Sequence, residues 1–128
     1  MSREKVLHAK ALGAEVILTR SDVGKGHPDY YQDLAHDILR RTPGAIYANQ
    51  FENPANPAAH EATTGPEILA QMDGDVDAIV VGVGSGGTLT GTGRYMKAHS
   101  PKTAMVLADP VGSILAPLVN TGEMTEAG

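Results

Sequence analysis

A short run of glycine and hydroxyl residues in the second half of the chain has the chemistry of an anion-binding loop. Its members are Gly84, Ser85, Gly86, Gly87 and Thr88. Glycine lets a ligand approach backbone N–H groups closely, because it has no side chain and few forbidden conformations. An apolar stretch, Ala78 to Val81, precedes this loop, and a helix-compatible stretch follows it. The first N–H groups of such a helix lack partners and carry its positive dipole end, so this order predicts a strand, a phosphate-binding loop and a helix.

The loop alone leaves the identity of the phosphate open. Its glycines also match the G-x-G-x-x-G pattern of dinucleotide-binding loops, and Asp109 follows at roughly the 20-residue interval of a ribose-binding acid. Ser85 and Thr88 instead favour a terminal phosphate, which has several oxygens to satisfy. No Gly-Lys-Ser/Thr follows, which excludes a nucleoside-triphosphate P-loop. A monophosphate cofactor, NAD and a structural turn without a ligand therefore remain open at this point.

Composition excludes several classes of function. The 128 residues suffice for a domain with a core, and their net charge of -5 argues against nucleic-acid or anionic-membrane partners. The absence of cysteine excludes disulfides, thiol catalysis and thiolate metal sites, and it fits a cytoplasmic protein. The five histidines form no i, i+4 pair that would bind zinc. Neither a membrane-spanning run nor an export leader is expected from the sequence.

Hydrophobic periodicity predicts alternating helices and strands. Helices are expected at residues 3–12, with Ser2 as cap and Gly13 as stop, at 28–41, at 56–72 with an interruption at Gly65-Pro66, and at 88–99. Strands are expected at residues 14–19, 45–48, 77–81 and 103–108, and residues 109–128 are turn-rich and weakly patterned. This alternation predicts an α/β fold with a doubly wound parallel sheet. Four strands and abrupt ends suggest an incomplete sheet, and therefore a fragment.

A second motif makes the prediction more specific. Residues 50–67 read Gln-Phe-Glu-Asn-Pro-Ala-Asn-Pro-Ala-Ala-His-Glu-Ala-Thr-Thr-Gly-Pro-Glu. This segment closely resembles one found in cysteine synthases and cystathionine β-synthases, the fold-type II pyridoxal-phosphate (PLP) enzymes. Residues 84–88 fit the G-[TS]-G-G-T phosphate loop of that family. Residues 108–113 and 12–16 resemble its Ala-Asp-Pro-x-Gly-Ser segment and its helix-to-strand junction, so the resemblance covers nearly the whole chain.

The resemblance implies roles for individual residues. Gly84, Ser85, Gly86, Gly87 and Thr88 would bind the phosphate of pyridoxal 5'-phosphate, and the Gln50 amide would lie near the carboxylate of the bound amino acid. Phe51 stands where cysteine synthases often have phenylalanine, and it could equally be a core aromatic. Asp109 becomes a turn former at a strand end, and His60 a hydrogen-bonded structural histidine. Residues 1–49 would end the smaller, mobile domain, and residues 50–128 would belong to the large cofactor-binding domain of a homodimer.

The implied reaction is a β-replacement on a small amino acid. It would make cysteine from O-acetylserine and sulfide, or cystathionine from serine and homocysteine. No catalytic residue is assigned here, because the Schiff-base lysine and the serine at the pyridine nitrogen lie outside this segment in the family. The five lysines, Lys5, Lys10, Lys25, Lys97 and Lys102, do not occupy that lysine's motif. The chain alone is therefore expected to be inactive. The alternatives are an NAD-dependent oxidoreductase and a non-catalytic binding fragment.

Overall fold

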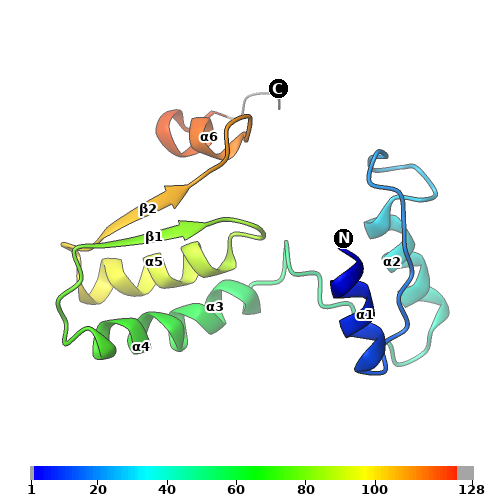
Figure 1. Ribbon diagram of the computed structural model, residues 1–128, viewed down its shortest axis with the longest axis horizontal. Helices are drawn as coiled ribbons and strands as arrows, with labels where there is room; N and C mark the ends of the chain where they lie inside the picture. The colour runs from blue at the N-terminus through cyan, green and yellow to red at the C-terminus, as the bar shows by residue number, and fades with distance from the viewer. Residues whose placement is uncertain (1, 124–128) are drawn as a thin grey trace. The chain divides into compact units, whose positions relative to one another are not determined.

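The computed structural model describes residues 2–123 and shows an α/β protein (Figure 1). The chain divides into two compact units, Met1–Tyr47 and Ala48–Gly128. The first unit contains two helices, and the second contains four helices and a parallel sheet. The predicted α/β class with parallel strands is therefore confirmed. No helix within residues 2–123 is long and apolar enough to span a membrane.

The first helix ends where its glycine predicts. Helix α1, Arg3–Ala11, is followed by Gly13 at a φ of +86°. The N–H of Gly13 donates to the Lys10 carbonyl, and the N–H of Ala14 donates to the Ala9 carbonyl, each at 3.0 Å. This pair of bonds is a Schellman motif, which satisfies carbonyls that the helix end leaves free. Ser2 occupies the N-cap position, but its side chain makes no capping hydrogen bond.

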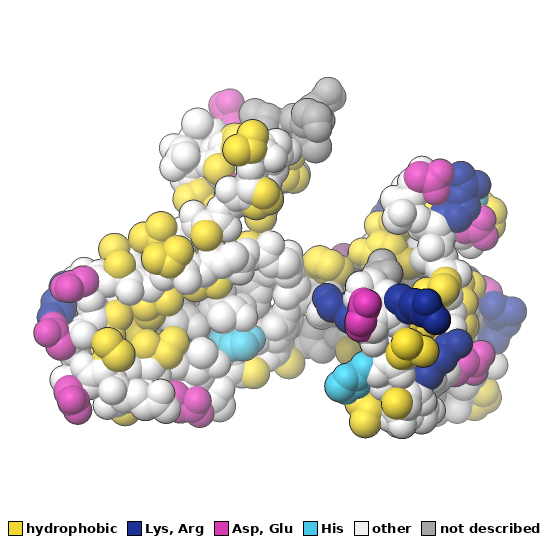
Figure 2. Space-filling view, in the orientation of Figure 1, with side chains coloured by type: hydrophobic (Ala, Val, Ile, Leu, Met, Phe, Trp, Pro, Cys, Tyr) yellow, Lys and Arg dark blue, Asp and Glu magenta, His cyan; other side chains and the backbone are white. Residues whose placement is uncertain are grey.

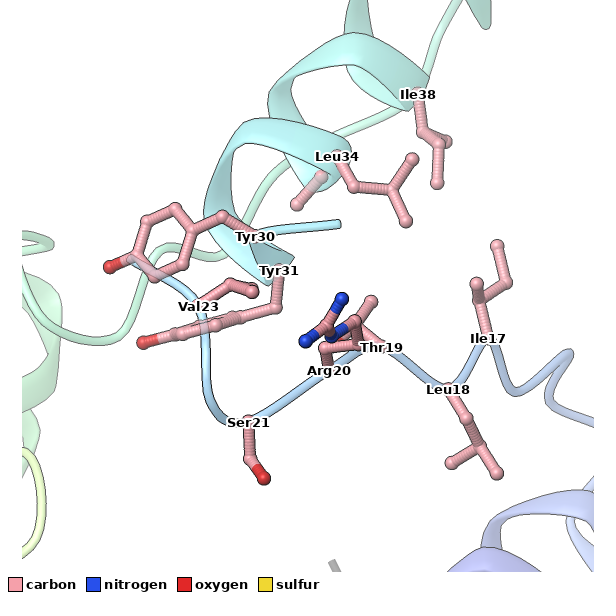
Figure 3. A pocket seen from close by; sticks show the side chains of 11 residues that line it. Ile17, Leu18, Thr19, Arg20, Ser21, Val23, Tyr30, Tyr31, Leu34 and Ile38 are labelled. Carbon is pink, nitrogen blue, oxygen red and sulfur yellow. The ribbon is translucent and has the colours of Figure 1, made fainter. Parts of the chain in front are cut away.

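The second helix begins later than predicted. Helix α2, Tyr31–Arg41, follows a turn that contains Pro28, in which the Tyr30 N–H donates to the His27 carbonyl at 2.9 Å. On one face of this helix, Leu34, Ala35 and Ile38 line a cavity of about 600 Å³. Figure 3 shows Ile17 pointing toward this face of α2, whereas Leu18 points away from it.

Two of the predicted strands are absent from the described residues. Segments 14–19 and 45–48 contain no strand residues, and neither forms a ladder with another segment. Most of their apolar side chains are exposed: Ile17 is 53%, Leu18 69% and Ile46 93% exposed. A strand needs a neighbour to accept and donate its backbone hydrogen bonds, and no described segment of this unit supplies one.

The second unit is built around two parallel strands joined by a helix. Strand β1, Ala78–Gly82, leads to helix α5, Gly87–His99, and then to strand β2, Ala104–Ala108. The register runs from Ala78 opposite Ala104 to Gly82 opposite Ala108. These bounds differ from the predicted ones by one residue at each altered end. The predicted βαβ unit, and with it the position of the glycine loop, is confirmed.

The predicted helix at 56–72 is two helices. Helix α3, Ala55–Ala62, and helix α4, Thr64–Gln71, meet at Thr63, whose φ and ψ are -124° and -67°. Pro66 has no N–H to donate to the carbonyl of Ala62, and its ring crowds that carbonyl. The helix therefore breaks just before the Gly65-Pro66 pair rather than at it.

One face of the sheet is covered by helices. Helix α5 packs against α3, α4 and both strands, with Met96 and Thr92 fully buried on α5 (Figure 1). Val80 and Val106 on the opposite face are 66% and 42% exposed, so the described residues leave that face of the sheet uncovered. Figure 2 shows hydrophobic side chains at the surface in the region of β1 and β2.

The segment after β2 forms a helix that the sequence pattern did not predict. Helix α6, Leu115–Thr121, is short and contains Pro117, which weakened its helical signal. Its start is stabilised by side chains before it: the Ala116 N–H donates to Asp109 Oδ2 at 2.9 Å, and the Leu115 N–H donates to Ser113 Oγ at 3.2 Å. The end of the predicted turn-rich segment, residues 124–128, lies outside the described residues.

Candidate anion-binding site

The glycine loop lies at the carboxyl end of β1, where open α/β sheets bind ligands. Gly86 is the N-cap of α5 at a φ of +84°, a conformation that favours glycine. The first backbone bond into the helix runs from the Thr90 N–H to the Gly86 carbonyl at 3.0 Å. The N–H groups of residues 86–89 donate no hydrogen bond to any described residue. Helix α5 therefore offers a row of free donors and its positive dipole end to this loop.

The loop encloses a hollow of the right size for a phosphate group. Residues 82–89 line a cavity of about 50 Å³. A single water needs roughly 10–15 Å³ of such volume, so the hollow holds a group of a few heavy atoms. A Cβ added at Gly84 would meet nothing within 4 Å, so the backbone there is open to approach. The donors, the dipole and the size together fit a phosphate monoester.

Helix α3 lies very close to the loop and to the start of α5. A Cβ on Gly87 would overlap the Asn56 side chain, and a Cβ on Gly91 would overlap the Pro57 carbonyl and lie 2.8 Å from His60 Cβ. Gly87 and Gly91 are one helical turn apart, as are Asn56 and His60. The absence of side chains at the two glycines therefore brings the short Asn56 and His60 side chains up to the loop.

Asn56 connects the loop to the segment that contains Gln50. Its Nδ2 atom donates to Ser85 Oγ and to the Gln50 carbonyl, each at 2.9 Å. A backbone carbonyl only accepts hydrogen bonds, so this contact fixes which end of the Asn56 amide is the NH₂ group. Ser85 Oγ therefore accepts from Asn56, and the hydroxyl proton of Ser85 remains free for another acceptor.

His60 makes the corresponding contact with the second loop hydroxyl. Its Nε2 atom lies 3.2 Å from Thr88 Oγ1, and its Nδ1 atom lies 2.9 Å from Thr64 Oγ1. His60 and Thr64 are half-buried, whereas Thr88 is exposed. The expectation of a hydrogen-bonded histidine is met, and one of the two partners of its ring, Thr88, is a loop residue. The sequence analysis did not predict this contact or the role of Asn56; the matching four-residue spacings of Asn56 with His60 and Gly87 with Gly91 were the available signal.

Gln50 and Phe51 lie beside the loop. Both line a hollow of about 180 Å³ together with Asn56, Ser85 and Gly86. Gln50 lies in a turn and not at the end of a strand, because the strand predicted at 45–48 does not form. Phe51 is 51% exposed, which excludes a core position within the described residues.

Other candidate residues lie away from the loop or have structural partners. The Asp109 carboxylate caps α6, as a turn-forming residue would. Lys97 is in the last turn of α5, and Lys102 pairs with Asp75 at 2.8 Å, ahead of β2. Both lysines of the second unit therefore lie at the end of the βαβ unit opposite the loop. No cluster of three or more metal-binding side chains occurs among residues 2–123.

The comparisons with known proteins agree with the family resemblance of residues 50–67, 84–88 and 108–113. The family model described as pyridoxal-phosphate dependent enzyme matches residues 1–126. Cysteine synthase 3 of Caenorhabditis elegans is 45% identical over 113 residues, which are 88% of this chain and 33% of that protein. Cysteine synthase A of Escherichia coli K12 is 40% identical over 130 residues, 100% of this chain and 40% of that protein.

Cystathionine beta-synthase of Apis mellifera is 39% identical over 117 residues, 91% of this chain and 23% of that protein. The chain thus spans between 23% and 40% of the length of these relatives. The match removes the NAD alternative, because the family depends on pyridoxal phosphate. The chain belongs to the family of pyridoxal-phosphate-dependent enzymes, with cysteine synthases and cystathionine β-synthases among its relatives.

Proposed function

We propose that this chain holds the phosphate of pyridoxal 5'-phosphate in an enzyme of β-replacement. The observation that carries the proposal is the loop of residues 84–88, with free N–H groups at the start of α5 around a phosphate-sized hollow. Membership of a PLP-dependent family supplies the chemical identity of the phosphate.

The residues of this chain would bind and orient the cofactor and the substrate, and we assign no proton transfer to them. Gly84, Gly86 and Gly87 would donate backbone N–H groups to the phosphate oxygens, and Ser85 and Thr88 would donate their hydroxyls. A cofactor fixed at its phosphate has a fixed ring position, which lowers the entropic part of the barrier. When bound, pyridoxal phosphate supplies an electron sink for the substrate. The Gln50 amide would bind the substrate carboxylate in the adjoining hollow.

The substrates that we propose follow from the relatives. Cysteine synthases are named among them, as are cystathionine β-synthases. The enzyme would form cysteine from O-acetylserine and sulfide, or cystathionine from serine and homocysteine. Parallel assays of the two substrate pairs with the full-length protein distinguish them. The homodimer, the cytoplasmic location and the division at residues 49 and 50 into a smaller and a larger domain remain proposals of the same kind.

Loss of the cofactor from loop variants tests the proposal. In the full-length protein, Thr88→Ala should weaken cofactor retention, and Ser85→Ala with Thr88→Ala should weaken it further, because each hydroxyl supplies a charge-assisted hydrogen bond worth about 1.5–3 kcal/mol. Retention is measured as the visible absorbance that survives dialysis. Thr121→Ala is the matched control, because the Thr121 hydroxyl bonds the Pro117 carbonyl within α6. Unchanged retention in the double variant would remove the loop assignment.

Gln50→Ala separates substrate binding from cofactor binding. In the full-length protein it should raise the KM for the amino-acid substrate and leave cofactor retention near that of the wild type. Gln50 lines a hollow beside the loop, whereas the loop hydroxyls contact Asn56 and His60. Equal loss of both properties would show that Gln50 supports the loop and not the substrate.

A further inference from the structure

We infer that Asn56 and His60 of α3 are positioning residues that orient the hydroxyl protons of Ser85 and Thr88 toward the bound phosphate. The inference rests on the proposed function and extends it from the loop to the helix beneath it. Two side chains one helical turn apart on α3 each contact one of the two loop hydroxyls. Each contact determines whether that hydroxyl accepts or donates on the α3 side.

For Ser85, the contacts of the Asn56 amide determine the direction of the hydrogen bond. The Asn56 NH₂ group has two protons, and its two contacts are the Gln50 carbonyl and Ser85 Oγ, each at 2.9 Å. Because the carbonyl can only accept, the nitrogen is the donor in both contacts. Ser85 therefore accepts on the α3 side, and its own proton is available to an acceptor in the loop. A phosphate oxygen is such an acceptor.

For Thr88 the direction depends on the tautomer of His60. A neutral imidazole has one N–H donor and one acceptor nitrogen. The Thr64 hydroxyl lies 2.9 Å from Nδ1 and has no other hydrogen-bond acceptor among the described residues. If Thr64 donates to Nδ1, the proton of the ring is on Nε2 and donates to Thr88 Oγ1. Thr88 can then donate to the phosphate, which completes a one-directional chain from Thr64 through His60 to the anion.

The close contact between α3 and α5 makes both chains possible. A Cβ atom on Gly87 would overlap the Asn56 side chain, and a Cβ atom on Gly91 would lie too close to His60. Both glycines are buried. Chains of aligned hydrogen bonds polarise one another, so each loop hydroxyl becomes a better donor than an isolated one. The two hydroxyls are thus preorganised for an anion before it arrives.

The first test uses the phosphate group of the ligand as the readout. The affinity of the full-length apoenzyme for pyridoxal phosphate is divided by its affinity for pyridoxal, which lacks the phosphate. His60→Phe keeps a ring but removes both nitrogens, and it should lower this ratio about threefold to tenfold, the net worth of one hydrogen bond. In a Thr88→Val background the same substitution should have no further effect, because it acts through the Thr88 hydroxyl. His99→Phe is the matched control, because His99 bonds the Tyr95 carbonyl at the far end of α5.

The outcomes separate this inference from the proposed function. A wild-type enzyme with no preference for pyridoxal phosphate over pyridoxal would overturn both. A wild-type preference that Thr88→Val lowers and His60→Phe leaves intact would overturn the inference alone. Equal losses of affinity for both ligands in His60→Phe, or losses additive with Thr88→Val, would show a purely structural role and also overturn it.

The second test needs no substitution and therefore survives a variant that fails to fold. Nitrogen-15 NMR of histidine-labelled, full-length holoenzyme reports which ring nitrogen of each histidine carries a proton. Sequential assignment of the wild-type protein identifies the His60 signal. We expect a proton on Nε2 of His60 in the cofactor-bound enzyme. A bare Nε2 with a proton on Nδ1 would overturn the inference, because Thr88 would then donate to His60 instead of to the phosphate.

Discussion

Thr92 and Thr103 are two buried threonines of the second unit with opposite hydrogen-bonding states. Thr103 Oγ1 lies 2.8 Å from both the Val76 carbonyl and Ser100 Oγ, all in buried residues. Thr92 Oγ1 has no hydrogen-bond partner in the structure. Thr103→Val should therefore lower the free energy of unfolding by about 1–3 kcal/mol, since it leaves buried polar atoms unsatisfied.

The same substitution at Thr92 is the matched control. Thr92→Val removes a hydroxyl that bonds to nothing and keeps the shape of the side chain, so the free energy of unfolding should stay equal or rise. Urea unfolding of both variants measures the difference. A Thr92→Val variant as unstable as Thr103→Val would mean that the Thr92 hydroxyl has a partner that this structure lacks.

At the scale of single residues, the sequence pointed to the loop hydroxyls but not to the residues that contact them. Ser85 and Thr88 stood out because hydroxyls among glycines have a direct chemical reading. Asn56 and His60 did not, because their role depends on the distance between two helices that are far apart in the sequence. The sequence allows Asp109 to be a ribose-binding acid or a turn former, and in the structure its carboxylate caps α6. A local pattern indicates what chemistry a side chain can do, whereas the residues that it contacts depend on three-dimensional packing.

At the scale of elements, glycines on α5 determine how closely α3 approaches. A Cβ at Gly91 would lie 2.8 Å from both Glu61 N and His60 Cβ, so Gly91→Ala should destabilise the protein by about 1–3 kcal/mol through overpacking. Gly93 lies on the same helix, and its Cβ would make only an ordinary 3.7 Å contact with Met105 Cγ. Gly93→Ala should instead stabilise it by about 0.5–1 kcal/mol, because alanine favours the helix. Thermal unfolding compares the two, and an equal effect of both would contradict this packing.

An exposed ion pair links the segments that precede the two strands. The hydrogen bond from Lys102 and then its charge hold the pKa of Asp75 below its ordinary value, and the same contacts with Asp75 raise the pKa of Lys102. A lowered carboxylate pKa stabilises the fold at pH values above the ordinary carboxylate pKa. This stabilisation is lost as the pH falls through the lowered pKa. The raised lysine pKa stabilises the fold at pH values below the ordinary lysine pKa. This stabilisation is lost as the pH rises through the raised pKa.

Lys102→Met should therefore destabilise the protein slightly at neutral pH and low salt. The difference should vanish in strong acid, where Asp75 is protonated, and shrink at high salt, because both side chains are exposed. Unfolding curves at several pH values measure it. A difference that persists unchanged in acid would show that Lys102 stabilises through packing instead.

The elements were predictable where the signal was local. The glycine stop of α1 and the elements of the βαβ unit around the loop follow from patterns of residues close together in the sequence. The strands expected at 14–19 and 45–48 depend on neighbours, which a local pattern does not contain. Helix α6 was missed because its start is stabilised by Asp109 and Ser113 rather than by its own residues.

At the scale of the whole molecule, the proposed phosphate site has no lysine near it among the described residues of the second unit. Lys97 lies ten residues after Gly87 along α5, which corresponds to about 15 Å of helix. Purified chain mixed with pyridoxal phosphate, O-acetylserine and sulfide should form cysteine no faster than free pyridoxal phosphate does. Turnover well above that background would mean that a lysine of this chain performs the chemistry.

The proposed phosphate site is the loop of residues 84–88. Long-wavelength anomalous diffraction from crystals of the full-length holoenzyme locates the phosphorus atom directly. We predict a phosphorus peak in the hollow lined by residues 82–89, with phosphate oxygens about 2.7–3.2 Å from the N–H nitrogens at the start of α5. A phosphorus peak elsewhere, with this hollow filled by solvent alone, would show that the loop does not hold the phosphate.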